Sequence, residues 1–237
     1  VTSSGKTEIY VKLINDFLKK DKQVLYLVPE IALTTQLISR LKQYFGDTLA
    51  VYHSKYSPEQ RTEIWKKVIK NDSGARVVIG ARSSIFLPYN NLGLIIVDEE
   101  HENAYKQFNP APRYHARDSA IFLSSLHKAK TLLGSATPSL ESYYNAVTNK
   151  YGLVTLNKRY GNVSLPKIII NDLKESVSKK MMNGNFSHIL LNNIKKTFNK
   201  KEQVILFQNR RGHSPYLECS SCGFVYQCIN CDVSLTY

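Results

Sequence analysis

The chain has 237 residues, of which 43% are hydrophobic, and it carries 32 Lys and Arg against 19 Asp and Glu, for a formal net charge of +13. This length and composition predict a globular protein with one large domain or slightly more. The excess of basic side chains favours a polyanionic partner. Because no run of eighteen apolar residues occurs, we expect no membrane partner and a cytoplasmic location.

The start of the chain is a candidate phosphate-binding site. The string VTSSGKT precedes a helical pattern and matches the end of the loop G-x-x-x-x-G-K-[ST], whose first glycine would stand just before Val1. Backbone N–H groups at a helix N-terminus hold phosphate oxygens, Lys6 can reach the β and γ phosphates, and the Thr7 hydroxyl can bind magnesium. The alternative is a serine-capped helix with a chance GKT. The predicted nucleotide-binding residues are Val1, Thr2, Ser3, Ser4, Gly5, Lys6, Thr7 and Glu8.

Apolar runs alternate with amphipathic patterns along the first two thirds of the chain. Runs at 24–28, 49–53, 77–80, 94–97 and 131–135 predict strands. We expect helices after the phosphate loop, after Pro29-Glu30, from residue 57, and after Thr137, which would cap its helix. Strands that alternate with helices predict an α/β fold with a mainly parallel sheet covered on both faces.

The helix expected from residue 57 has the clearest start signal. Ser57 stands at the cap position, with proline in the first turn and Gln60 placed to close a capping box. The residues expected on its buried face are Ile64, Trp65, Val68 and Ile69.

The string LIIVDEEH, residues 94–101, joins a buried strand to a group of acids. Open α/β sheets bind ligands at the C-terminal ends of their strands, and charges are rarely buried unless they are paired or bound to a metal. Taken alone, the string is also compatible with a strand that ends in a solvated acidic turn. With a phosphate loop in the same chain it predicts a hydrolysis site, in which Asp98 binds magnesium with Thr7 and Glu99 orients or deprotonates the attacking water. The predicted catalytic residues are Lys6, Asp98, Glu99 and His101.

Several strings together resemble a known family. In chain order, GKT, PE at 29–30, GARSSIF, DEEH and SATPSLES resemble conserved motifs of superfamily 2 helicases. SSGKTEIY, LVPEIALT, DEEHENAYKQ, PRYHARD, GSATPSLES and NRRGHSP are similar to the primosomal helicases of bacterial replication restart, along the whole chain. One departure is Ser3-Ser4, where the family usually has Gly-Ser, which removes no ligand.

This resemblance implies a RecA-like P-loop NTPase lobe of an ATP-dependent 3′-to-5′ DNA helicase, of the DEAH-box type, that acts in the restart of stalled forks and in primosome assembly. It implies ATP and Mg²⁺ as cofactors. It also implies that the partners are forked and single-stranded DNA, single-stranded DNA-binding protein and other primosome components, in a bacterial, nucleoid-associated setting. By motif, Ser135 to Thr137 couple hydrolysis to lobe movement. A different class of function, a nucleotide-switched nucleic-acid adaptor without unwinding activity, stays open.

The segment 102–118 is a candidate DNA-binding loop. It alternates aromatic and basic side chains and contains two prolines, a composition that suits base stacking and phosphate binding. The alternative is an Ω-loop packed by its own side chains. The loop is similar to the aromatic-rich loop of related helicases, which transmits DNA binding to the ATP site. The residues predicted to bind DNA or to couple it to hydrolysis are Arg82, Tyr105, Lys106, Phe108, Arg113, Tyr114, Arg117, Ser135 and Thr137.

The C-terminal third has a looser pattern. We expect helicase lobe 1 at 1–160, a linker at 161–186, the start of a second RecA-like lobe at 187–218 and a partial zinc-binding region at 219–237. Within these parts the pattern predicts strands at 165–172 and 204–207, a polar linker at 175–185, and a helix that starts at Ser187.

All four cysteines fall at the end of the chain, in the string CSSCGFVYQCINC. The spacing C-x-x-C is typical of zinc sites, but two pairs this close usually need a longer loop to face each other. The resemblance implies further cysteines downstream and two zinc ions in the full-length protein. We therefore treat the chain as a fragment that is nearly inactive alone and has incomplete zinc sites. The metal candidates are Cys219, Cys222, Cys228 and Cys231.

Overall fold

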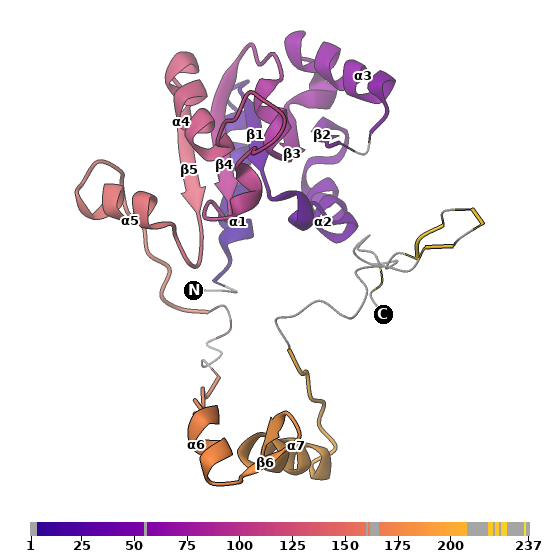
Figure 1. The fold of residues 1–237 in the computed structure, drawn as a ribbon. Helices are drawn as coiled ribbons and strands as arrows, with labels where there is room; N and C mark the ends of the chain where they lie inside the picture. The colour runs from indigo at the N-terminus through magenta and orange to yellow at the C-terminus, as the bar shows by residue number, and fades with distance from the viewer. Residues whose placement is uncertain are drawn as a thin grey trace. The chain divides into compact units, whose positions relative to one another are not determined.

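The computed structural model describes residues 4–54, 56–159, 161, 166–207, 218–219, 221–222, 224–226 and 235. They belong to two compact units, unit 1 (Val1–Val163) and unit 2 (Ser164–Tyr237) (Figure 1). Some sequence-based predictions lie outside the described residues, namely those for Val1, Thr2, Ser3, Cys228 and Cys231.

Unit 1 contains a five-stranded sheet in the order β2-β3-β1-β4-β5. Every neighbouring pair is parallel, which confirms the predicted α/β fold. The strands are β1 (Gln23–Leu27), β2 (Leu49–Tyr52), β3 (Val77–Gly80), β4 (Leu92–Asp98) and β5 (Lys130–Gly134). The helices are α1 (Lys6–Leu18), α2 (Thr35–Phe45), α3 (Pro58–Ile69), α4 (Ala116–His127) and α5 (Leu140–Val147).

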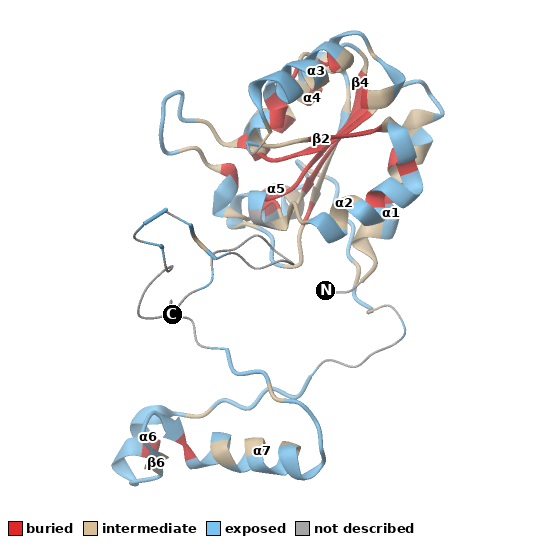
Figure 2. Ribbon diagram, turned by 90° about the vertical axis from the view of Figure 1, so that its right-hand side faces the viewer, coloured by how far each residue is buried: buried red, intermediate tan, exposed pale blue. Residues whose placement is uncertain are grey.

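The sheet has a hydrophobic core on each face, because successive side chains of a strand point to opposite sides. On one face, Val24 and Tyr26 of β1 pack with residues of α1 and α2. On the other, Leu25 and Leu27 pack with residues of α3 and α4. In Figure 2 the buried residues accordingly lie along the strands and on the inner sides of these helices. A sheet covered in this way leaves its C-terminal strand ends as the place for a site.

Helix starts follow the local capping chemistry. The Ser57 hydroxyl accepts from the Gln60 N–H and the Gln60 side chain accepts from the Ser57 N–H, so α3 begins with the predicted capping box. The predicted starts of two other helices were wrong. A 3₁₀ turn (Glu30–Ala32) follows Pro29, and α2 is capped by Thr34. The helix expected after Thr137 is capped by Ser139, whose hydroxyl accepts from the backbone N–H of Ser142.

The predicted buried face of α3 was partly wrong. Val68 is buried, but Trp65 and Ile69 are 45% and 41% exposed. Helix α3 covers the sheet beside the edge strand β2, so only its innermost side chains reach the core.

Unit 2 consists of a short helix, a small hairpin and a longer helix among its described residues. These are α6 (Leu173–Ser178), β6 (Met182–Asn183), β7 (Phe186–Ser187) and α7 (His188–Asn199). Helix α7 starts at Ser187 as predicted. The polar linker predicted at 175–185 was wrong, since α6 and the hairpin occupy much of it. The strands expected at 165–172 and 204–207 were also wrong: the described residues there form none, and side chains such as Ile170 and Ile205 are more than 90% exposed. Within the part of the chain that the structure describes, no helix has the length and apolarity needed to cross a membrane.

Candidate active site

The end of β4 and the phosphate loop meet in unit 1, although they are 93 residues apart in sequence. The Lys6 ammonium lies 2.5 Å from a carboxylate oxygen of Glu99 and 3.6 Å from one of Asp98. Each of these side chains is partly shielded from solvent. The structure thus brings Lys6 together with both carboxylates that were predicted to be catalytic.

The residues before α1 fit a phosphate group. Gly5 has φ of 85°, the left-handed region that glycine adopts without strain. The Ser4 hydroxyl is buried and has no hydrogen-bond partner within the described residues. A buried hydroxyl without a partner is costly, and a phosphate oxygen at the helix N-terminus would supply one. Together with Lys6 and the half-buried Thr7, this donor set suits the phosphates of a nucleotide with Mg²⁺.

Glu99 stands between the lysine and the histidine of the site. Its φ of 47° is unusual for a residue other than glycine, and strained backbone of this kind often occurs at functional sites. One Glu99 carboxylate oxygen contacts Lys6, and the other lies 3.7 Å from Nδ1 of His101. The turn after β4 therefore aims this carboxylate into the site.

His101 connects the strand end to the segment 135–137. Its Nδ1 lies 2.7 Å from the Ser135 hydroxyl and its Nε2 lies 3.3 Å from the Thr137 hydroxyl. The Ser135 hydroxyl also accepts from the Thr137 backbone N–H. A movement of the 135–137 segment would therefore move the imidazole beside Glu99. This contact suits the coupling role predicted for Ser135 and Thr137.

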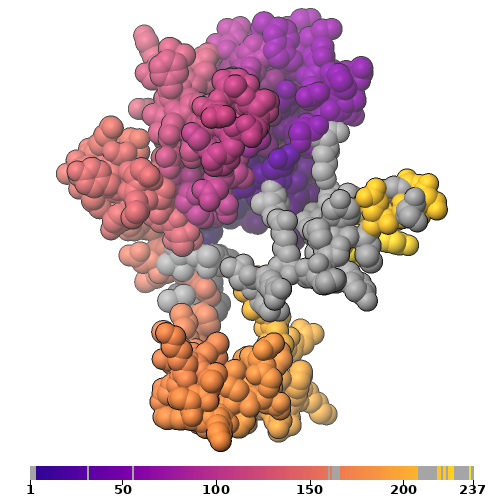
Figure 3. Space-filling model, in the orientation of Figure 1, coloured from indigo at the N-terminus to yellow at the C-terminus, as the bar shows by residue number. Residues whose placement is uncertain are grey.

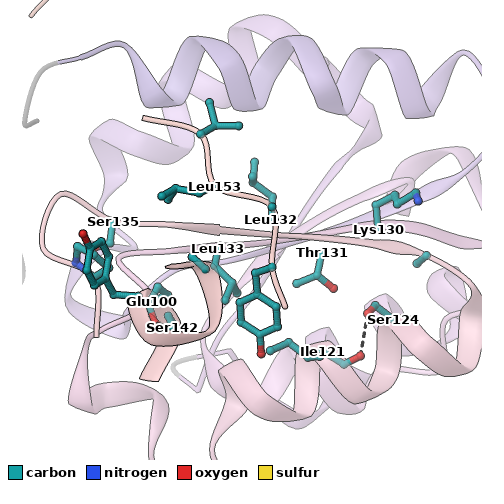
Figure 4. Close-up of a pocket in the computed structure, with 17 residues that line it drawn as sticks. Glu100, Ile121, Ser124, Lys130, Thr131, Leu132, Leu133, Ser135, Ser142 and Leu153 are labelled. Atoms are coloured by element: carbon teal, nitrogen blue, oxygen red, sulfur yellow. Dashed lines mark hydrogen bonds between the residues drawn. The ribbon is translucent and has the colours of Figure 1, made fainter. Parts of the chain in front are cut away.

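Glu100 occupies a buried cluster that the sequence reasoning did not identify. It is 1% exposed and accepts hydrogen bonds from Arg117, from both the backbone N–H and the hydroxyl of Ser139, and from the Ser142 hydroxyl, at 2.7 to 3.1 Å. Figure 4 shows Glu100 and Ser142 beside a pocket of about 460 Å³ that β5, α4 and α5 line. We call Glu100, Arg117, Ser139 and Ser142 the Glu100 cluster. It joins the end of β4 to α4 and α5.

The Glu100 cluster makes unit 1 sensitive to acid. Burial alone would raise the pKa of Glu100, but the hydrogen bonds from Ser139, Ser142 and Arg117 outweigh it, so the pKa lies below its usual value. A carboxyl group with a lowered folded-state pKa adds stability above its unfolded pKa of about 4.3 and loses it as the pH falls through the folded value. We expect the free energy of unfolding to fall with acidification below about pH 4.5, and to fall less in Glu100→Gln. Urea unfolding of both proteins at pH 7 and at low pH measures this, and equal pH slopes would contradict it.

The segment 103–115 forms a compact loop rather than an extended one. A 3₁₀ turn (Asn103–Tyr105) leads into it, and Lys106 and His115 pair as an antiparallel bridge at its base. The Gln107 amide donates to the carbonyl oxygens of Pro110 and Pro112. Figure 3 shows the segment around residue 110, in magenta, on the surface of unit 1 that faces the viewer. The loop is therefore held together by its own hydrogen bonds, as the alternative of an Ω-loop predicted.

Four of the predicted DNA and coupling residues lie at the extremes of exposure. Phe108 is 65% exposed and Arg113 is also exposed, so both are accessible to a nucleic acid. Tyr105 and Arg117 are only 1% and 8% exposed, which suits coupling rather than direct contact with bases or phosphates. The Tyr105 hydroxyl donates to the carbonyl oxygen of Asp98 at 2.6 Å, so the loop is bonded directly to the end of β4.

Arg82 and Tyr114 make contacts that position the loop 103–115. The Arg82 guanidinium donates to the carbonyl oxygen of Lys106 at 3.1 Å. The Tyr114 ring stands edge-on to Phe86 with ring centroids 4.8 Å apart. In this structure both residues position the loop.

Two of the four cysteines fall within the described residues. Cys219 and Cys222 are exposed and unpaired by disulfide, beside a bridge between Glu218 and Val225. Hydrogen bonds from Ser221 and Cys222 lower the pKa of the Cys219 thiol, which favours the thiolate that binds metals. Two thiolates fit half of a tetrahedral zinc site. Over the described residues, no group of three or more metal-binding side chains occurs.

Comparison with known proteins decides the family. A family model described as DEAD/DEAH box helicase matches residues 1–146, more than half of the chain. The chain belongs to the DEAD/DEAH box helicase family. A domain of this family implies the use of ATP and Mg²⁺, in agreement with the fit of the loop before α1.

The DEAD/DEAH box helicase chain is also similar to curated replication restart proteins. Replication restart protein PriA of Bacillus subtilis (strain 168) is 45% identical over 100% of this chain and 29% of its own length. The PriA proteins of Rickettsia felis and Chlamydia trachomatis are 48% and 43% identical over 98% and 100% of this chain, and over 35% and 31% of their own lengths. The chain therefore spans about a third of these relatives.

Among solved structures, RecG bound to a three-way DNA junction aligns with 61% of this chain and 18% of its own at 24% identity, with a TM-score of 0.43. This likeness is too weak to support an inference about the chain.

Proposed function

We propose that this chain is the ATP-hydrolysing part of a 3′-to-5′ DNA translocase that restarts stalled replication forks. The observation that carries the proposal is the contact of Lys6 with the carboxylates at the end of β4. The similarity to PriA proteins supports the restart role. Forked and single-stranded DNA, single-stranded DNA-binding protein and other primosome components are the partners that this role requires.

Each side chain of the site has a task in this proposal. Lys6 leaves Glu99 to contact the β and γ phosphates when a nucleotide binds, and the Ser4 hydroxyl gains a phosphate partner. Thr7 and Asp98 would hold Mg²⁺, which would supply positive charge against the negative charge that develops on the phosphates. Glu99, released by Lys6, then orients or deprotonates the attacking water. His101 transmits the change at Glu99 to Ser135 and Thr137 through its contacts with their hydroxyl groups.

The loop 103–115 is the proposed contact with DNA. Phe108 is placed to stack on a base and Arg113 to bind a phosphate. A displacement of this loop would reach Asp98 through the hydroxyl of Tyr105. DNA binding and ATP hydrolysis would thereby influence one another through one strand end.

The remaining parts of the chain belong to the proposal as well. Residues 187–218 would begin a second lobe, and Cys219 and Cys222 would bind zinc in the full-length protein together with further cysteines. Phosphoryl-transfer enzymes of this class gain several orders of magnitude in rate from an arginine finger. We place that finger in the remainder of a second lobe, so we expect little turnover from the chain alone.

The test of the proposed function is ATP turnover by the full-length protein with and without forked DNA. We expect DNA to stimulate turnover, and Lys6→Ala to lower it by about 10²- to 10³-fold, as for other donors to a developing negative charge. The matched control is Lys12→Ala, on the same helix but exposed, which should leave the rate unchanged. ATP binding without turnover in the wild type would favour the adaptor reading, and DNA-independent turnover would contradict the translocase.

A further inference from the structure

Asp98 is held by two tyrosines that are not among the predicted site residues. The Tyr10 hydroxyl donates to Oδ1 of Asp98 at 3.1 Å and the Tyr26 hydroxyl donates to Oδ2 at 3.2 Å. Tyr10 comes from α1, just after the phosphate loop, and Tyr26 from β1. The two rings meet edge to face with centroids 5.7 Å apart. One carboxylate is thus bonded through both oxygens to two different elements.

Packing fixes the position of both tyrosine rings. They are 3% and 0% exposed, and they belong to the core on one face of the sheet. A phenol hydroxyl is an uncharged hydrogen-bond donor, so each contact can orient the carboxylate without cancelling its charge.

The neighbouring strand leaves room for this arrangement. Gly134 pairs with Asp98 across β4 and β5. A Cβ atom on Gly134 would stand 1.8 Å from the Tyr10 hydroxyl, a distance at which the tyrosine would have to move. The glycine of the GSAT string thus serves the contact between Tyr10 and Asp98.

The hydrogen bonds leave one acceptor position of the Asp98 carboxylate unoccupied among the described contacts. An ionised carboxylate has about four acceptor positions. Oδ1 accepts from Tyr10 and from the backbone N–H of Glu99, while Oδ2 accepts from Tyr26. The remaining capacity is on Oδ2, and the carboxylate plane cannot rotate without breaking both tyrosine contacts.

We propose that Tyr10 and Tyr26 are positioning residues that hold the Asp98 carboxylate in the orientation in which it binds Mg²⁺. This inference rests on the proposed function, in which Asp98 is a magnesium residue. Side chains that orient a metal-binding carboxylate through hydrogen bonds typically change metal affinity by about 10- to 100-fold when they are removed.

The test uses the full-length protein and a fluorescent, non-hydrolysable ATP analogue, titrated once in EDTA and once with increasing Mg²⁺. Tyr10→Phe with Tyr26→Phe should raise the half-saturating Mg²⁺ concentration by about tenfold or more and leave analogue binding in EDTA unchanged. Tyr89→Phe is the matched control, because it removes another buried hydroxyl, which donates to the Ser84 carbonyl oxygen away from Asp98. It should change neither value. An unchanged Mg²⁺ requirement in the double variant, or an equal loss of binding in EDTA, would overturn the inference.

Two more variants separate the possible failures. Gly134→Ala displaces Tyr10 but keeps its hydroxyl, and it should also raise the half-saturating Mg²⁺ concentration. If the double variant does not fold, Gly134→Ala and the two single tyrosine variants test the inference in its place. Asp98→Asn should raise the half-saturating Mg²⁺ concentration most. If Asp98→Asn raises it and the tyrosine variants do not, only this inference fails. If Asp98→Asn has no effect, the magnesium assignment in the proposed function fails, and the inference with it.

Discussion

Replacing Glu100 with alanine is expected to lower the free energy of unfolding of unit 1 by about 3 to 5 kcal/mol, the cost of removing one partner from a buried ion pair. The reason is the Arg117 guanidinium, which is 8% exposed and donates to Glu100. Without the carboxylate its remaining acceptors are the Ser139 hydroxyl and the exposed Asp118. The variant also leaves the backbone N–H of Ser139 without its acceptor at the start of α5.

Urea unfolding followed by the fluorescence of Trp65, the one tryptophan of the chain, measures this loss within unit 1. Glu141→Ala is the control, because Glu141 is an exposed acid in the first turn of α5 and should change the stability by at most about 1 kcal/mol. A loss in Glu100→Ala no larger than in this control would show that the Glu100 cluster does not hold unit 1 together.

Replacing Glu99 with glutamine is expected to abolish most turnover while nucleotide binding persists. Glutamine keeps the size of the side chain but cannot take a proton from water, and a positioned general base contributes about 10² to 10⁴ in rate. The change also removes the charge that Lys6 contacts at 2.5 Å. Lys6 is then free for phosphate, so we expect equal or tighter ATP binding.

Turnover and binding of ATP should be measured on the same preparations of the full-length wild type and Glu99→Gln. Glu141→Gln is a suitable control, because Glu141 is an exposed acid in the first turn of α5; its turnover should stay near that of the wild type. Weakened ATP binding in Glu99→Gln, with turnover reduced only in proportion, would assign Glu99 to binding rather than to hydrolysis.

Much of the fold of unit 1 could be predicted from the sequence, because local and global signals agree there. Strands β1, β3 and β4 are buried on both faces, so runs such as residues 24–28 and 94–97 are continuously apolar and stand out from the helices. The edge strand β5 is mostly half-buried. The capping box of α3 was predicted for the same reason, since both of its hydrogen bonds lie within four residues.

The errors in the fold have physical causes. Trp65 has the spacing of a core residue, but α3 lies beside an edge strand and buries only a narrow face. The run at 168–170 is as apolar as the core strands, yet it remains exposed in unit 2. Among the described residues of that unit, no strand pairs with it. Helix α4 was not predicted, and only its first three residues fall within the segment 102–118 that was interpreted as a loop.

The residues of the candidate site also fall into a group that could be predicted from the sequence and a group that could not. Lys6, Asp98, Glu99 and His101 belong to strings with a chemical signature, and the structure places them together. Tyr10, Tyr26 and Glu100 were not predicted as site residues, although Tyr10 ends the string SSGKTEIY and Glu100 lies in DEEH. Their contacts depend on which helix and strand lie side by side. A weak signal existed for Glu100, since a third consecutive acid at a buried strand end needs several donors.

The most direct test of the central claim is a single-turnover experiment with labelled ATP and the full-length protein, with and without forked DNA. If the end of β4 is a hydrolysis site that DNA controls, the bound ATP is converted to ADP and phosphate faster when DNA is present, and Glu99→Gln binds the same ATP and leaves it intact. If the wild type holds ATP unchanged in the presence of DNA, or if Glu99→Gln hydrolyses it at the wild-type rate, the account is contradicted.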